Sequence, residues 1–180
     1  MNRRNQTVNL VMTGLCIAIG IVLPMAFHSV PNAGSVILPM HIPVLLCGLI
    51  CGPVYGLAAG ILTPALSSLL TQMPPMAYLP SMLCELAIYG LVAGLAIRLI
   101  RTKSNVANVY ISLVASMLCG RVIYGVVNAL IFQAGKYSME LWLTASFVTA
   151  LPGIIIQLVA IPVLVLLLQK AGLVRNAQRA

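Results

Sequence analysis

Acidic residues are almost absent from this chain. Only two occur among 180 residues, and Asp, Glu, Lys and Arg together make up 7% of the sequence, whereas soluble domains carry about 25% charged residues. The chain is instead 61% hydrophobic, and its mean hydropathy is +1.08. This composition indicates an integral membrane protein with little mass outside the bilayer. Two carboxylates also leave little for acid–base catalysis, so we do not expect an enzyme.

Aromatic residues are also few, with six Tyr, three Phe and one Trp, and they are not interleaved with basic residues. The net charge of +8 therefore indicates membrane orientation and contact with anionic lipid rather than nucleic-acid binding. The sequence contains no nucleotide-binding loop, no metal-binding His/Glu helix and no nucleophile elbow. We expect a protein that binds and moves a small molecule without a cofactor of its own.

The cysteines and histidines do not form a recognisable metal or disulfide pattern. The five cysteines all fall within apolar segments: Cys16, Cys47, Cys51, Cys84 and Cys119. Their odd number and apolar surroundings argue against a disulfide framework and favour simple packing. The two histidines, His28 and His41, are separated in the sequence and have no accompanying carboxylates, so we predict no metal centre.

The apolar segments are long enough for six crossings of a bilayer, because one crossing takes about 20 apolar residues. We predict an all-α bundle of six transmembrane helices that forms a single domain over residues 1–180. The predicted helices cover approximately residues 7–27, 41–51, 55–72, 78–100, 107–133 and 141–169. The second and third are joined by a very tight turn at Cys51-Gly52-Pro53, and Met73-Pro74-Pro75-Met76 forms an outer turn because two prolines cannot continue a helix.

Basic residues orient this bundle. They gather at the start of the chain, in the segment 98–103 and after the last apolar segment, from Lys170 to Arg179. Short loops rich in Lys and Arg remain in the cytoplasm. Six crossings place both termini on the same side, which agrees with the charges at both ends. We therefore expect a multi-pass membrane protein with both termini inside, an outer loop over about residues 28–40 and another at 135–137.

Two charged residues fall inside apolar segments and mark a candidate site. At 1.5 Å per residue, Glu85 lies about 10 Å from the outer end of its helix, and Arg121 lies about 9 Å below the outer surface. An unpaired charge at such depth costs at least about 2.5–3.5 kcal/mol. The two residues could form a salt bridge that fixes two helices, or they could line a ligand pocket in which Arg121 grips a carboxylate.

Polar residues at similar depth are the candidate walls of that pocket. Arg121, Tyr124 and Asn128 are spaced by three and four residues, so we expect them on one helix face. Tyr89 follows Glu85 by four residues. The remaining candidates come from other segments: His41, Gln72 and Trp142. A polar lining confined to the outer half is typical of a pocket for a small polar molecule.

The first apolar segment carries Gly14 and Ala18, four residues apart. Such small-xxx-small spacing lets a second helix approach closely. The pair could serve packing within the bundle, or it could form a docking face for another membrane subunit.

The chain resembles a known family over nearly its whole length, and three short segments show the resemblance most clearly. The strings LPMHIPVLL at 38–46, GPVYG at 52–56 and ELAIYG at 85–90 resemble those of substrate-binding S components of energy-coupling factor (ECF) transporters, a branch of the ABC-type importers. The resemblance also covers size, six helices and the motif at Gly14 and Ala18, although Ala is usual at the first of these positions.

The resemblance implies a mechanism and partners. An S component binds a vitamin from outside, docks through its first helix onto a transmembrane coupling (T) subunit that bears two ATPases, and topples to release the vitamin inside a bacterial cell. Arg121 favours an anionic vitamin such as pantothenate or niacin. Glu85 favours a protonated ring, as in hydroxymethylpyrimidine or pyridoxine, and folate carriers show similar strings. The composition is also compatible with a stand-alone small-solute transporter or with a membrane subunit that has no ligand.

Overall fold

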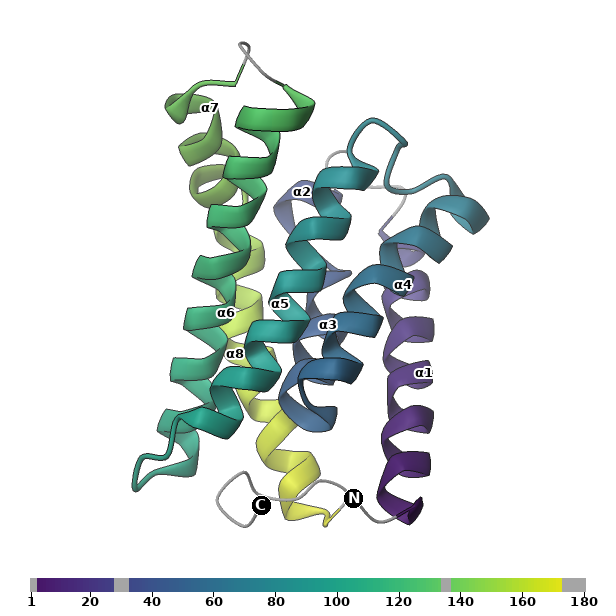
Figure 1. Ribbon diagram of the computed structural model, residues 1–180, viewed down its shortest axis with the longest axis vertical. Coiled ribbons are helices and arrows are strands. Elements are labelled where there is room, and N and C mark those ends of the chain that lie inside the picture. The colour runs from purple at the N-terminus through teal and green to yellow at the C-terminus, as the bar shows by residue number, and fades with distance from the viewer. Residues whose placement is uncertain (1–2, 28–32, 134–136, 173–180) are drawn as a thin grey trace.

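The computed structural model describes residues 3–27, 33–133 and 137–172, and all regular structure in these ranges is helical (Figure 1). The elements are α1 (Arg3–Ala26), α2 (Ala33–Val36), α3 (His41–Cys51), α4 (Pro53–Thr71), α5 (Leu79–Leu99), α6 (Asn105–Val127), the π-helix η1 (Asn128–Phe132), α7 (Met139–Leu143), the π-helix η2 (Thr144–Thr149) and α8 (Leu151–Lys170). Within the described residues, six helical segments are long and apolar enough to cross a membrane. The predicted all-α bundle of six crossings is confirmed.

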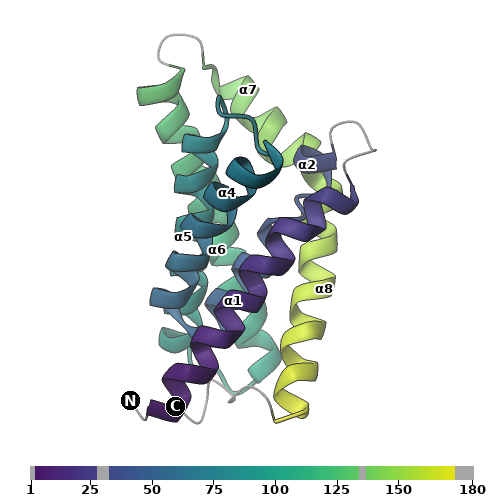
Figure 2. The same cartoon turned by 90° about the vertical axis from the view of Figure 1, so that its right-hand side faces the viewer.

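The two ends of the bundle differ in composition. The start of α1 and the end of α8 lie together at one end, which also carries the connection between α5 and α6 (Figures 1 and 2). We call this the terminal end. Arg98 is in the last turn of α5 and Lys170 in the last turn of α8, so basic residues gather here. That the terminal end faces the cytoplasm stays a prediction from this charge. The opposite end carries α2 and α7 and is called the cavity end.

The predicted helix over 141–169 is wrong in its outer part. The structure divides this stretch into α7, η2 and α8, and a turn at Ala150 precedes α8. Pro152 lies in the first turn of α8. A proline has no N–H and restricts the residue before it, so it starts a helix more readily than it continues one. As a result, α7 and η2 leave the axis of α8 at the cavity end (Figure 2).

Both predicted outer loops lie partly outside the described residues. Residues 28–32 of the first loop and residues 134–136 of the second are not described. The described part of the first loop contains the short helix α2. The tight turn predicted at Cys51-Gly52-Pro53 is present: Gly52 has φ 98°, and Pro53 begins α4.

Glycines let α3, α4 and α5 pack backbone against backbone. A Cβ added to Gly48 or Gly56 would collide with the backbone carbonyl of Gly90, and one added to Gly90 would collide with the backbone of Gly56. Small residues take this role in membranes because apolar side chains gain little by leaving lipid for a helix interface. The three helices form a tight block that holds His41 and Glu85 in place.

This packing gives a first testable prediction. Replacing Gly90 by alanine should lower the free energy of unfolding by about 1–3 kcal/mol, because the new methyl group overpacks a backbone contact. Thermal unfolding of the detergent-purified protein measures the change. Gly14→Ala is the matched control, since nothing lies within 4 Å of a Cβ at Gly14. Equal melting temperatures for the two variants would contradict the prediction.

Candidate functional site

A cavity of about 530 Å³ opens at the cavity end of the bundle. Its walls come from the end of α1, the segment from α2 into α3, the turn between α4 and α5, and the parts of α5, α6 and η2 nearer the cavity end. The lining residues are Pro24, Phe27, Gly34, Ser35, Leu38, Pro39, Met40, His41, Met73, Pro74, Pro75, Tyr78, Met82, Glu85, Arg121, Tyr124 and Ala145. Most of this wall is apolar, and the charged groups in it are confined to one region.

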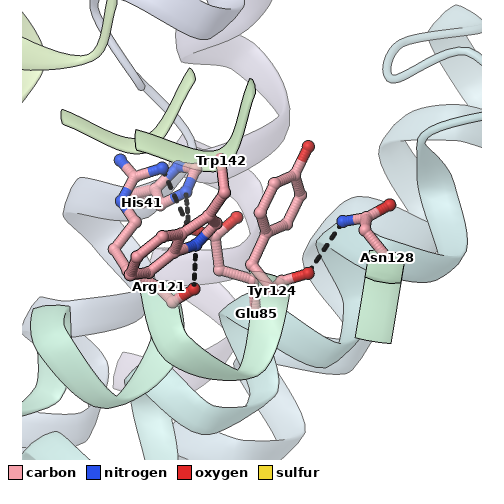
Figure 3. Close-up of polar contacts among 6 residues, drawn as sticks. All are labelled: His41, Glu85, Arg121, Tyr124, Asn128 and Trp142. Carbon is pink, nitrogen blue, oxygen red and sulfur yellow. Dashed lines mark hydrogen bonds and ion pairs between the residues drawn. The ribbon is translucent and has the colours of Figure 1, made fainter. Parts of the chain in front are cut away.

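That region contains His41, Glu85 and Arg121, which come from three different helices (Figure 3). His41 is the first residue of α3, Glu85 lies in the second turn of α5, and Arg121 lies in the half of α6 nearer the cavity end. All three are buried, with 2%, 3% and 5% of their surface exposed, respectively. Their proximity confirms the prediction that Glu85 and Arg121 lie at similar depth.

Glu85 lies next to two basic side chains. Its Oε1 lies 3.2 Å from Nη1 of Arg121 and 3.7 Å from Nε2 of His41 (Figure 3). The imidazole of His41 also packs edge-on against the ring of Tyr89, with a centroid distance of 5.3 Å. Pairing offsets part of the cost of burying the two opposite charges, although a buried pair is seldom a net source of stability. The pair joins α5 to α6 at the wall of the cavity.

Several polar atoms of this cluster have no hydrogen-bond partner among the described residues. They are Nε and Nη2 of Arg121, both ring nitrogens of His41, Oε1 of Glu85 and the hydroxyl of Tyr89. A buried polar group left unpaired costs about 1–3 kcal/mol, and native proteins seldom leave one without a reason. In Arg121, Nε and Nη2 form one side of the planar guanidinium. This side can pair with both oxygens of a carboxylate at once.

The structure brings some of the predicted site residues to the cavity and places others elsewhere. His41, Glu85, Arg121 and Tyr124 line the cavity. Tyr89 is fully buried behind His41. Gln72 is exposed at the end of α4, where it adopts a left-handed conformation with φ 58°. The binding roles of all these residues stay predictions.

Asn128 and Trp142 make contacts that the sequence did not indicate. Asn128 donates a hydrogen bond to the carbonyl of Tyr124 and accepts one from Ser81, both at 2.8 Å. Trp142 donates from Nε1 to the carbonyl of Arg121 at 2.9 Å (Figure 3). Neither side chain is part of the cavity lining, so both support the wall from behind.

Sequence reasoning missed the apolar part of the cavity. Methionines and prolines supply much of it, including Met40, Met73, Met82 and Pro74. Methionine side chains adapt to irregular shapes and make favourable contacts with aromatic rings. Part of this apolar wall comes from the run Met73-Pro74-Pro75-Met76, which the sequence pattern predicts only as a turn.

Comparison with known families decides what kind of protein carries this cavity. Residues 8–165 match the family described as ECF transporter, substrate-specific component. The chain belongs to the S components of ECF transporters. No curated protein and no solved structure is significantly similar to it, so the family match alone carries the assignment.

S components bind a substrate without catalysing a reaction, and they pair with T and ATPase modules. One face of α1 carries two small residues and is exposed. Gly14 and Ala18 are both exposed, and nothing lies within 4 Å of a Cβ at Gly14. The opposite face of α1 packs on the bundle, where Oγ1 of Thr13 lies 3.6 Å from Sγ of Cys47. The two small residues therefore do not serve packing within the described part of this S component.

Proposed function

We propose that this S component captures a small water-soluble vitamin or precursor that carries a carboxylate, with pantothenate and niacin as the leading candidates. One observation carries the proposal: Arg121 lines the cavity, and its Nε and Nη2 are buried without a hydrogen-bond partner among the described residues. Since an arginine cannot lose its charge in a protein, it retains its affinity for an anion at any physiological pH.

The position of Glu85 supports an anionic ligand over a cationic one. Its Oε1 already contacts Arg121 and His41, so a protonated ring would have to compete with the guanidinium that the protein supplies. The size and lining of the cavity also support a small organic acid. Its volume of about 530 Å³ falls within the range of about 300–1,000 Å³ that is usual for small-molecule sites. The methionines and prolines would then contact the apolar body of the ligand.

In the proposed cycle the vitamin enters from outside at the cavity end. The loaded protein then docks through Gly14 and Ala18 onto a T subunit that bears two ATPases, topples in the bilayer and releases the vitamin in the cytoplasm. Two features of the chain support this division of labour. The sequence has no nucleotide-binding loop, and the described face of α1 at Gly14 is open to a partner.

A thermal-shift panel tests the proposed substrate. The detergent-purified protein is heated with nicotinate and nicotinamide, with pantothenate and pantothenol, and with hydroxymethylpyrimidine, pyridoxine and folate. A ligand at 100 times its Kd should stabilise the fold by about 2.7 kcal/mol. We expect one carboxylate compound to raise the melting temperature and its neutral counterpart to do so far less. A response to a neutral or cationic compound alone would contradict the carboxylate assignment.

A further inference from the structure

Trp142 connects the segment α7–η2 to the ligand-facing part of α6. The backbone of α7 packs chiefly on its own continuation η2, and η2 has its closest helix neighbours in α2 and α8. The link to α6 is made by a side chain: the indole N–H of Trp142 donates to the carbonyl of Arg121 at 2.9 Å. Figure 3 shows the indole lying directly over the backbone of the residue whose guanidinium reaches Glu85.

The surroundings of this indole fit it closely. Gly125 leaves a notch in α6, and a Cβ at that position would lie 2.5 Å from Nε1 and 2.6 Å from Cδ1 of Trp142. On the other side, the ring of Phe147 in η2 meets the indole edge-on, with a centroid distance of 5.6 Å and an interplanar angle of 90°. The indole is thus held between α6 and η2, and η2 also places Ala145 in the cavity wall.

We propose that Trp142 is a positioning residue for substrate binding, which acts through Arg121. Its indole fixes the backbone of α6 at Arg121 and ties α7–η2 to that point. Capture of a carboxylate by Arg121 and the position of η2 in the cavity wall are then coupled through one hydrogen bond and one glycine notch. This inference rests on the proposed function, since it concerns the group that Arg121 binds.

The physical reason is preorganisation. A bidentate pair requires both donors of the guanidinium to be aimed at the same time, and a residue held by a fixed backbone and a supporting contact loses less freedom on binding. A shift of α6 at Arg121 would misdirect both donors together. It would not alter the apolar part of the cavity, which comes largely from other elements.

Two substitutions test the inference in the full-length protein. Trp142→Phe keeps an aromatic ring but removes the donor, and Gly125→Ala fills the notch. Affinities are measured by calorimetry with nicotinate against nicotinamide and with pantothenate against pantothenol. We expect each substitution to weaken binding of the responding carboxylate about tenfold, as loss of one hydrogen bond to a positioned group does. Binding of the neutral counterpart should change less than about twofold. Leu141→Ala, an exposed position on the same helix, is the control and should change neither.

A double-mutant cycle separates positioning from a general effect on the fold. In a background that carries Arg121→Lys, the further change Trp142→Phe should have almost no effect on affinity, because residues that act through one another are not additive. Equal loss for the carboxylate and its neutral counterpart would overturn the inference, as would full additivity with Arg121→Lys or unchanged affinity in Trp142→Phe. If the unmodified protein binds none of the four compounds, the proposed function itself has failed, and this result appears before any variant is made.

Discussion

Replacing Arg121 by glutamine should weaken binding of the carboxylate substrate at least about 100-fold. The substitution removes two donors that can each form a charge-assisted hydrogen bond, and such bonds contribute about 1.5–3 kcal/mol apiece. Nearly all of the guanidinium is already withdrawn from water, since Arg121 is 5% exposed. Little desolvation of the protein is therefore needed when the ligand binds. Calorimetry with nicotinate and pantothenate measures the loss.

The same substitution leaves Glu85 buried without its arginine, which alone could lower the free energy of unfolding by about 3–5 kcal/mol. A second variant, Glu85→Gln with Arg121→Gln, removes both charges and should recover most of the stability while binding remains lost. Arg101→Gln is the matched control, because it removes the same charge at an exposed site in the connection between α5 and α6. Wild-type affinity in a folded Arg121→Gln protein would refute the assigned role.

Glu85 provides the contrast between an anionic and a cationic ligand. If the substrate is a carboxylate, Glu85→Gln should leave it bound or bind it more tightly, because Arg121 is freed from a competing charge. If the substrate is a protonated pyrimidine or pyridoxine, Glu85→Gln should cost more affinity than any change at Arg121. The affinities of this one pair of variants thus distinguish an anionic from a cationic vitamin.

The similar depth of Glu85 and Arg121 could be predicted from residue counting. Each sits at a fixed number of residues from a helix end, and a helix rises a constant 1.5 Å per residue, so depth follows directly from position. The six crossings could also be predicted from the sequence, because long apolar segments separated by turn residues leave few other arrangements. Both predictions rest on periodic geometry and on the cost of burying polar groups in lipid.

Local geometry decides which of the predicted residues line the cavity. Asn128 shares with Arg121 the face of α6 that meets α5, since Asn128 bonds Ser81 and Arg121 pairs with Glu85. It lies four residues beyond Tyr124 and is not part of the cavity lining. From its depth alone, Trp142 is predicted to lie in the wall of the cavity. The helix is interrupted before Pro152, so the segment that carries Trp142 packs against α6 through a hydrogen bond from the indole to the carbonyl of Arg121. Contacts made by glycine backbones, such as Gly56 with Gly90, leave no pattern of hydrophobicity at all.

Replacing Gly14 and Ala18 together by leucine should abolish energised uptake while leaving substrate affinity unchanged. Two leucines on this face would hold a partner helix away from the backbone of α1, and the close packing that joins membrane helices would be lost. The S component itself should fold normally, since both residues are exposed and a Cβ at Gly14 meets nothing within 4 Å. We expect co-purification with the T subunit to fall at least about tenfold, which corresponds to roughly 1.4 kcal/mol of docking free energy.

The control is Cys119→Leu, which adds bulk at an exposed position of α6. The small residues at four-residue spacing on this helix, Ser112, Ser116 and Gly120, are buried within the bundle. Uptake is measured in vesicles that contain the T subunit and its ATPases, and substrate affinity is measured on the isolated S component. Wild-type uptake in the double variant would show that docking uses another face. Loss of uptake together with loss of substrate affinity would show that α1 supports the cavity rather than the partner. Retained affinity with lost uptake would separate binding from delivery, because Arg121 and the small residues of α1 lie on different helices and in different surroundings.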